Sequence, residues 1–350
     1  MKHLEKRDLV EASLSGEDVW RVPVSAWGHL IPAETDNAEY ARAQVAYLKE
    51  FDWDWLKINN RATLFAEAWG NRFDFRDYSG VLARYLGSPL GTPADISMIE
   101  SLDISGGVLG AYLERALKPI LKNINGIPAI QTVFSPLTTL AFIAGRPKFH
   151  DQAEGNRAHA EALKTMIRDD PQGTHRALKA ITKTLGDFAE ASVSLGADGI
   201  FMAIMLLARD GILTVEEYEE FGKPYDTEIL SRVAHARLNL LHICGPHCYF
   251  KIAEELPANA ISWGSVGQNN PTVGEARKSL DKVLVSGIDE IDTLTNGTPA
   301  DIEAQAAQTL RASGKRKVFL SPGCCIALTT PKENLHALRQ VVERENCYGN

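Results

Sequence analysis

Short apolar segments alternate along the chain with longer segments in which apolar residues recur at every third or fourth position. The short segments are rich in β-branched and aromatic residues and predict strands at residues 22–27, 55–58, 129–134, 199–204, 239–244, 260–264, 283–286 and 318–321. The longer segments predict helices, most clearly at residues 158–167, 175–195, 215–235 and 298–313. This alternation, repeated about eight times, predicts parallel strands joined by crossover helices.

Eight strands in 350 residues favour a closed barrel. The main alternative, a doubly wound open sheet, normally carries a glycine fingerprint after its first strand, and Trp27-Gly28-His29-Leu30 does not match one. We therefore predict an α/β fold in which residues 1–350 form a single (β/α)8 TIM barrel domain. Residues 61–127 contain no clear strand, so we expect an insertion after the second strand that caps the mouth of the barrel.

Charge and composition exclude several classes of function. The net charge is −8 and the 37 basic residues are scattered, so binding to nucleic acid or to an anionic membrane has no electrostatic basis. The amino-terminal segment is polar, unlike a signal peptide, and no apolar run approaches the ~20 residues of a membrane span. The 5 cysteines suit a reducing compartment better than a disulfide framework. We expect a cytoplasmic protein.

Histidine and cysteine residues at two predicted strand ends form a candidate metal site. His242 and Cys244 are two residues apart on the fifth strand, so their side chains share a face. Cys324 and Cys325 follow the eighth strand, and closure of the barrel brings both strand ends to one mouth. One imidazole and two thiolates with an open fourth position suit Zn²⁺. The structural alternative is packing, in which a free cysteine acts as a small apolar residue.

Other polar residues near the strand ends are further candidates. His29 ends the first strand and could face the mouth as a catalytic residue that hydrogen-bonds the substrate, although core or loop packing explains it equally well. Gln131, a polar residue in the apolar run of the third strand, is the second candidate catalytic residue. His247 and Cys248 add two donors near the fifth strand and could replace a named metal ligand. Three acidic residues after the seventh strand could accept a hydrogen bond from a metal-binding histidine: Asp289, Glu290 and Asp292.

Several segments, in the right order, resemble the uroporphyrinogen decarboxylase superfamily. They are residues 6–12, 16–17 and 21–24, PAIQTVFSPLTTLAFIAG at 128–145, GADG at 196–199 with YEEFGKPY at 218–225, and Gly323-Cys324 followed by TPKEN at 330–334. The resemblance runs along nearly the whole chain and implies the barrel fold that the pattern predicts.

One branch of this superfamily comprises porphyrin decarboxylases, whose arginine-rich amino-terminal loop binds substrate carboxylates. The matching residues 25–32 contain no arginine, so a substrate with many carboxylates would lose its cationic contacts. The acidic residue expected after the second strand is also missing from Asn59-Asn60-Arg61. The sequence therefore departs from this branch.

The other branch comprises corrinoid-dependent methyltransferases that pass a methyl group to a thiol such as coenzyme M. Their zinc ligands are a His-x-Cys pair and a distant cysteine, and His242, Cys244 and Cys324 match this pattern. Cys324 follows a glycine, as the family cysteine does, so the resemblance favours it over Cys325. Coordination to Zn²⁺ would remove the proton of an acceptor thiol and keep a nucleophilic thiolate at neutral pH.

The leading hypothesis is a zinc-dependent methyltransferase that activates a thiol acceptor for transfer from a methylcorrinoid or a similar donor. The expected partners are a small-molecule thiol or methylated substrate, a corrinoid protein and a second copy of the chain in a homodimer. Two alternatives remain open: a cofactor-free decarboxylase of a porphyrinogen-like carboxylated substrate, and a non-catalytic barrel that only binds or assembles.

Overall fold

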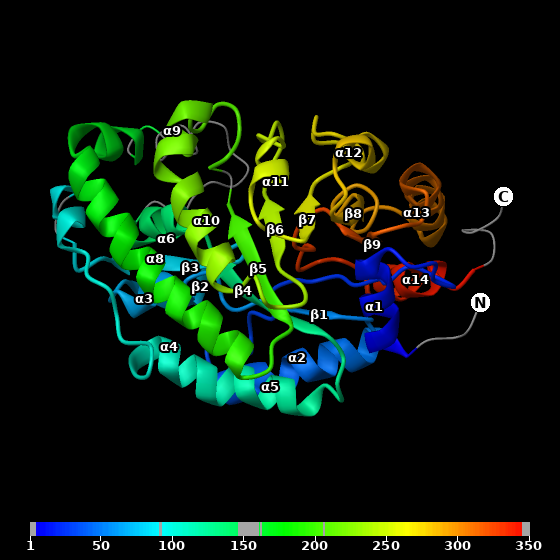
Figure 1. The fold of residues 1–350 in the computed structure, drawn as a ribbon. Helices are drawn as coiled ribbons and strands as arrows, with labels where there is room; N and C mark the ends of the chain where they lie inside the picture. The colour runs from blue at the N-terminus through cyan, green and yellow to red at the C-terminus, as the bar shows by residue number, and fades with distance from the viewer. Residues whose placement is uncertain (1–4, 91–92, 146–160, 162, 206, 345–350) are drawn as a thin grey trace.

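The computed structural model describes residues 5–90, 93–145, 161, 163–205 and 207–344. A curled parallel sheet of 7 strands, in the order β1-β4-β5-β6-β7-β8-β9, forms its centre (Figure 1). The strands are β1 (Leu56–Ile58), β4 (Ala129–Phe134), β5 (Gly199–Ile204), β6 (Leu240–Ile243), β7 (Ala260–Trp263), β8 (Val283–Ile288) and β9 (Val318–Pro322). Every residue of these strands is buried, as expected for a parallel sheet covered on both faces.

The first predicted strand, residues 22–27, forms only a single parallel bridge, between Val24 and Leu320. The Leu320 N–H donates to the Pro23 carbonyl at 2.8 Å, and the Asp54 N–H donates to the Val24 carbonyl at 3.1 Å. The segment is thus hydrogen-bonded both to β9 and to the residue two positions before β1, the two edges of the sheet. Full pairing is prevented because Pro23 has no N–H and the Val24 N–H donates to the Asp54 carboxylate at 2.8 Å. The fold is TIM-barrel-like, with seven full strands where eight were predicted.

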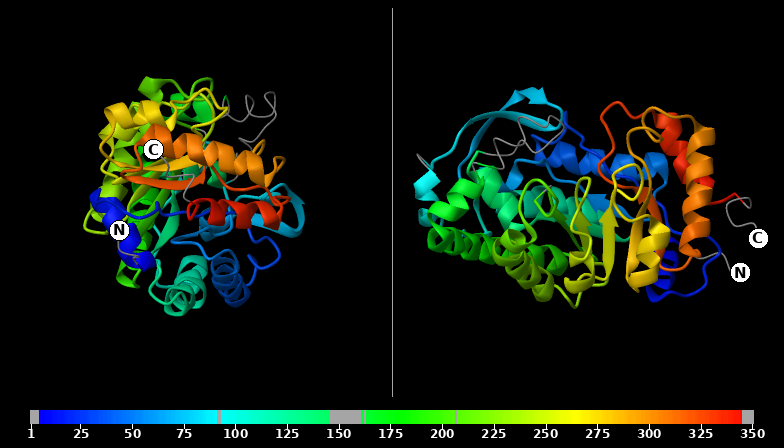
Figure 2. Two further views of the ribbon diagram at one scale, coloured as in Figure 1. Left: turned by 90° about the vertical axis from the view of Figure 1, so that its right-hand side faces the viewer. Right: turned by 90° about the horizontal axis from the view of Figure 1, so that it is seen from above.

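Helices pack on the outer side of the sheet, α8 against β4 and β5 and α13 against β8 and β9 (Figures 1 and 2). The helices are α1 (Lys6–Ser15), α2 (Asn37–Phe51), α3 (Leu64–Ala68), α4 (Gly107–Tyr112), α5 (Lys118–Asn123), α6 (Pro136–Ile143), α8 (Pro171–Ser194), α9 (Val215–Phe221), α10 (Lys223–Arg232), α11 (Ile252–Glu255), α12 (Val273–Ser279), α13 (Pro299–Ser313) and α14 (Lys332–Val341), with a 3-10 helix η1 (Pro93–Met98) and a π-helix η2 (Leu113–Leu117).

The predicted helices at residues 175–195 and 298–313 are confirmed as α8 and α13. The single helix predicted at residues 215–235 is wrong, because α9 ends and α10 begins at Gly222, where a Cβ would lie 2.4 Å from the Tyr218 ring. Of the helix predicted at residues 158–167, positions 158–160 and 162 lie outside the described residues, and the remainder is helical.

Residues 61–127, between β1 and β4, contain an antiparallel hairpin of β2 (Arg72–Ser79) and β3 (Leu82–Gly87). The expectation that this stretch has no strand is therefore wrong. Its strands are difficult to recognise because they are largely exposed and carry charged residues such as Asp74, which forms an ion pair with Arg84 at 2.9 Å.

Buried hydrophobic side chains from all parts of the described chain form one core cluster. Inside the curled sheet, the Trp27 ring lies 5.7 Å from Trp55 and 5.5 Å from Phe201, measured between ring centroids. The Phe201 ring also lies 5.2 Å from the His242 ring, so this aromatic cluster extends to the candidate site. Within the described ranges, no helix has both the length and the apolar character needed to cross a membrane.

Candidate metal centre

His242 and Cys244 are presented by β6, in the middle of the sheet between β5 and β7. His242 is the third residue of β6 and Cys244 follows its last residue, so the two side chains point to the same face. Both are buried, with exposed fractions of 4% and 6%. The strand therefore orients the imidazole and the thiol before any ligand binds.

Cys324 approaches the same place from the loop after β9. Gly323 makes this approach possible, because a Cβ at this position would lie 2.7 Å from the Gly264 Cα and 3.1 Å from the Glu290 Oε2. The first of these is a backbone atom after β7 and cannot move aside easily. A glycine is required here to bring the loop of Cys324 against the end of β7.

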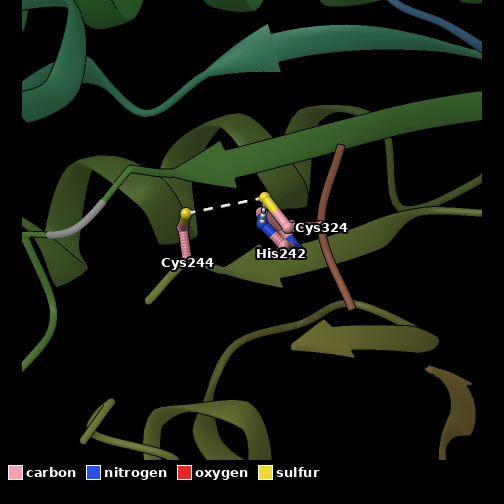
Figure 3. Close-up of side chains that lie close together, drawn as sticks. All are labelled: His242, Cys244 and Cys324. Atoms are coloured by element: carbon pink, nitrogen blue, oxygen red, sulfur yellow. Dashed lines mark hydrogen bonds between the residues drawn. The ribbon is translucent and has the colours of Figure 1, made fainter. Parts of the chain in front are cut away.

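The structure brings the three predicted ligands together (Figure 3). The Cys244 and Cys324 sulfurs are 3.8 Å apart, and the Cys324 sulfur is 3.7 Å from the His242 Nε2. All three ligand atoms lie within 4.8 Å of one another. They come from residues separated by up to 82 positions in the sequence, so the tertiary structure brings the group together.

The environment of His242 keeps its ring in the form that binds metals. Its Nδ1 lies 3.2 Å from the Ser262 Oγ, on the neighbouring strand β7, which leaves Nε2 facing the sulfur of Cys324. Burial, and then the positive charge of Lys57, lowers the pKa of His242 to about 4, so the imidazole is neutral at neutral pH. The Phe201 ring stacks on the imidazole with centroids 5.2 Å apart.

The hydrogen-bond partner of His242 is thus Ser262, and none of the three acidic residues considered from the sequence. The Asp289 carboxylate instead accepts from the backbone N–H of Ile291 at 2.9 Å and stabilises its own loop. Glu290 is buried and accepts from the Gln268 amide at 3.0 Å. Ser262 carried no signal in the sequence, because a small polar residue within a buried strand usually serves packing.

The other sulfur and nitrogen donors lie outside the group. The Cys325 sulfur is 3.9 Å from the Asn59 Oδ1. The His247 Nε2 accepts from the Asn269 amide at 3.3 Å, and burial raises the pKa of the Cys248 thiol to about 12. Among the described residues, Cys324 is therefore the cysteine whose sulfur lies in one group with the donor atoms of His242 and Cys244.

The two residues expected to be catalytic have different surroundings. The His29 Nδ1 is 3.0 Å from the Glu34 Oε1; burial opposes protonation, but the hydrogen bond and charge of Glu34 outweigh it and raise the pKa of His29. Gln131 is fully buried, donates to Asn60 at 2.9 Å and accepts from the Tyr112 hydroxyl at 3.1 Å. The catalytic roles of His29 and Gln131 remain predictions.

The sequence reasoning missed Lys57, a buried lysine in the middle of β1. Its ammonium lies 4.3 Å from the centroid of the Phe201 ring and donates a hydrogen bond to the Asn59 Oδ1. Burial, the largest effect, lowers the pKa of Lys57, while negative charge on the neighbouring cysteine thiolates would raise it. In the sequence, Lys57 could have been recognised as a single lysine within the apolar run of residues 55–58.

Comparisons with known proteins agree with this architecture. The family model for uroporphyrinogen decarboxylase (URO-D) matches residues 5–345. Over 248 residues the chain is 27% identical to the methylcobamide:CoM methyltransferase MtbA of Methanosarcina mazei, covering 70% of this chain and 66% of that protein, just under two thirds of its length. Over 163 residues it is 28% identical to a uroporphyrinogen decarboxylase of Chlorobaculum parvum, covering 46% of this chain and 44% of that protein.

Solved structures show the same fold at low sequence identity. A methyltransferase from Methanosarcina mazei superposes with a TM-score of 0.73 at 21% identity, covering 97% of this chain and 99% of that one. A B12-independent methionine synthase from Shewanella sp. W3-18-1 superposes with a TM-score of 0.55 at 12% identity, covering 92% of this chain and 91% of that one. Because the family model spans nearly the whole chain, the protein belongs to the uroporphyrinogen decarboxylase (URO-D) family.

Proposed function

We propose that this protein is a zinc-dependent methyltransferase that binds a thiol acceptor and activates it for methyl transfer from a methylcorrinoid or a similar donor. The observation that carries the proposal is the convergence of His242, Cys244 and Cys324 at the end of the sheet where β6 and β9 terminate. Its similarity to a methylcobamide:CoM methyltransferase supports the reaction class.

The distances between the three donors fit a tetrahedral zinc ion. Zn–S bonds of ~2.3 Å place two sulfurs ~3.8 Å apart, and a Zn–N bond of ~2.0 Å places nitrogen and sulfur ~3.5 Å apart. The observed separations are 3.8 Å between the sulfurs and 3.7 Å between the Cys324 sulfur and the His242 Nε2. Three protein ligands leave one position for an exchangeable group, and thiolates favour zinc over magnesium or calcium.

When bound, zinc would supply a positive charge that keeps the acceptor sulfur deprotonated at neutral pH. The residues of the chain would orient the ligands and exclude water. Ser262 holds the His242 ring in the orientation that presents Nε2, and β6 fixes Cys244 on the same face. Two cysteine thiolates donate electron density, which preserves the nucleophilicity of a third sulfur. The buried ring of Phe201 helps to exclude water from the same region.

Further expectations remain part of this proposal. Residues 1–350 would form one domain in the cytoplasm, with a corrinoid protein as the methyl-donating partner and a homodimer as the assembly. The insertion after β1 would cap the mouth through the β2–β3 hairpin.

Metal analysis of protein purified without chelators tests the proposal. We expect about one zinc per chain, lost in His242→Ala, Cys244→Ala and Cys324→Ala. Cys248→Ala is the matched control, because it removes a partly buried thiol outside the group, and it should retain the metal. Zinc retained by all three ligand variants would contradict the assignment.

The second part of the test replaces zinc by Co²⁺ and adds small thiols. We expect new thiolate-to-metal absorbance, because the acceptor sulfur occupies the fourth position. Uroporphyrinogen should not be turned over, since residues 25–32 provide no arginine for its carboxylates. Decarboxylation that survives Cys244→Ala would establish the alternative activity of the family.

A further inference from the structure

Lys57 places a buried positive charge beside the candidate metal centre. It lies in the middle of β1, its exposed fraction is 4%, and its ammonium rests on the face of Phe201 at 4.3 Å from the ring centroid. The same ring stacks on His242 at 5.2 Å between centroids. The thiols of the centre are also within electrostatic range of the ammonium.

The ammonium has no carboxylate partner among the described residues, and its hydrogen-bond acceptor is the neutral amide oxygen of Asn59. Two other basic side chains at this end of the sheet are paired. Arg61 makes two hydrogen bonds with Glu67, at 2.7 and 2.8 Å, and His29 contacts Glu34 at 3.0 Å. The charge of Glu34 also acts on Lys57, but Glu34 contacts His29, so the buried ammonium, which has no ion pair of its own among the described residues, would be stabilised by further negative charge.

The proposed metal centre would supply this negative charge once an anionic ligand occupies its fourth position. A divalent zinc ion with two cysteine thiolates and a neutral histidine has no net charge. When an acceptor thiolate takes the fourth position, the net charge becomes −1, in a buried environment where charge is poorly screened. The ammonium of Lys57 balances that charge only in the thiolate-bound state.

We propose that Lys57 is a positioning residue that favours an anionic fourth ligand at the metal centre by balancing the charge that this ligand adds. The inference rests on the proposed zinc site. Lys57 stabilises the centre with a bound thiolate more than it stabilises the centre before thiol binding. Direct contact between Lys57 and the acceptor is not required.

The test compares anionic and neutral ligands of the Co²⁺-substituted protein by absorbance titration. The probes are 2-mercaptoethanol, which binds as a thiolate, azide as a second anion, and imidazole as a neutral ligand. In Lys57→Met, which keeps the length of the side chain, we expect thiol and azide to bind at least about tenfold more weakly. Imidazole affinity and metal content should change less than threefold, and Lys57→Arg should restore anion binding.

Lys49→Met is the matched control, because it removes the same charge from an exposed position of α2. It should leave all three affinities unchanged. Equal weakening of azide and imidazole in Lys57→Met would show a merely structural role and overturn the inference. An effect confined to thiols with an acidic tail, such as 3-mercaptopropionate, would overturn it in favour of direct binding of the tail.

Failure of the proposed function gives a different result. If the Co²⁺ protein binds azide but no thiol, the thiol-activating function is contradicted, while the azide and imidazole titrations still decide the role of Lys57. A protein that binds no metal contradicts both.

Discussion

The hydrogen bond between Ser262 and His242 allows a sharp test of the proposed metal centre, because a substitution of Ser262 leaves all three proposed ligands in place. Metal binding through Nε2 requires the proton of the ring on Nδ1, where it can donate to the Ser262 Oγ at 3.2 Å. Ser262 lies directly beside His242 in the register of β6 and β7 and is fully buried. In Ser262→Ala the hydroxyl is lost and only the backbone of residue 262, which also interacts with the imidazole, remains as a partner, so the ring is held less firmly in this tautomer.

The expected magnitude follows from the distance. Loss of a partner that orients a metal-binding histidine typically costs about 10- to 100-fold in metal affinity. A separation of 3.2 Å is at the long end of the range for a hydrogen bond, so the lower end applies. We expect zinc to bind about tenfold more weakly in Ser262→Ala, which corresponds to ~1.4 kcal/mol.

Competition with a chromophoric chelator at pH 7.5 measures this change. Ser286→Ala is the matched control, because Ser286 is equally buried on β8 but donates to the Trp263 carbonyl and contacts Ser265. Its zinc affinity should remain within twofold of the unsubstituted protein. Zinc affinity unchanged in Ser262→Ala, or lowered equally in both variants, would refute the reasoning.

Three further predictions follow from the same structure. Gly323→Ala should lower zinc affinity at least tenfold in the chelator assay, because the added Cβ would lie 2.7 Å from the Gly264 Cα and displace the loop that carries Cys324; unchanged affinity would show that the loop adapts. Zinc affinity should fall steeply from pH 8 to pH 5 in a dialysis series, since protons compete for thiolates and imidazole, whereas carboxylate ligands would retain the metal. The third concerns Asp226, where burial raises the carboxyl pKa to about 7 although the Tyr218 hydroxyl donates to it at 2.6 Å. The folded state therefore binds a proton that the unfolded state releases near its ordinary pKa of 3.8, and stability is lost as pH rises from about 4 to 7. Relative to the unsubstituted protein, Asp226→Asn should gain ~3 kcal/mol between pH 5 and pH 8 in urea unfolding, and a parallel pH dependence of the two proteins would contradict this.

The strands of the sheet were largely predictable because parallel strands are buried on both faces and appear as apolar runs. Seven of the eight predicted runs correspond to β1 and β4–β9, with boundaries that differ by a few residues. The strand predicted at residues 22–27 is not fully formed, because the Val24 N–H donates to the Asp54 carboxylate and is not available for pairing with a neighbouring strand. The β2–β3 hairpin was missed because its residues are mostly exposed and its pattern is not apolar.

The sequence by itself determined which residues could bind a metal: a histidine and a cysteine two positions apart on one strand, and a cysteine after a glycine at the end of another. Spacing on a strand is a local property, so the shared face of His242 and Cys244 followed directly. Only the tertiary structure decided that the Cys324 sulfur joins them while the Cys325 sulfur lies against Asn59, because the direction of a side chain in a loop depends on what the loop packs against. The same holds for Ser262 and Lys57, whose proposed roles depend on the tertiary structure: Ser262 lies beside His242 through strand pairing, and the buried ammonium of Lys57 lies on the face of Phe201, which comes from another strand.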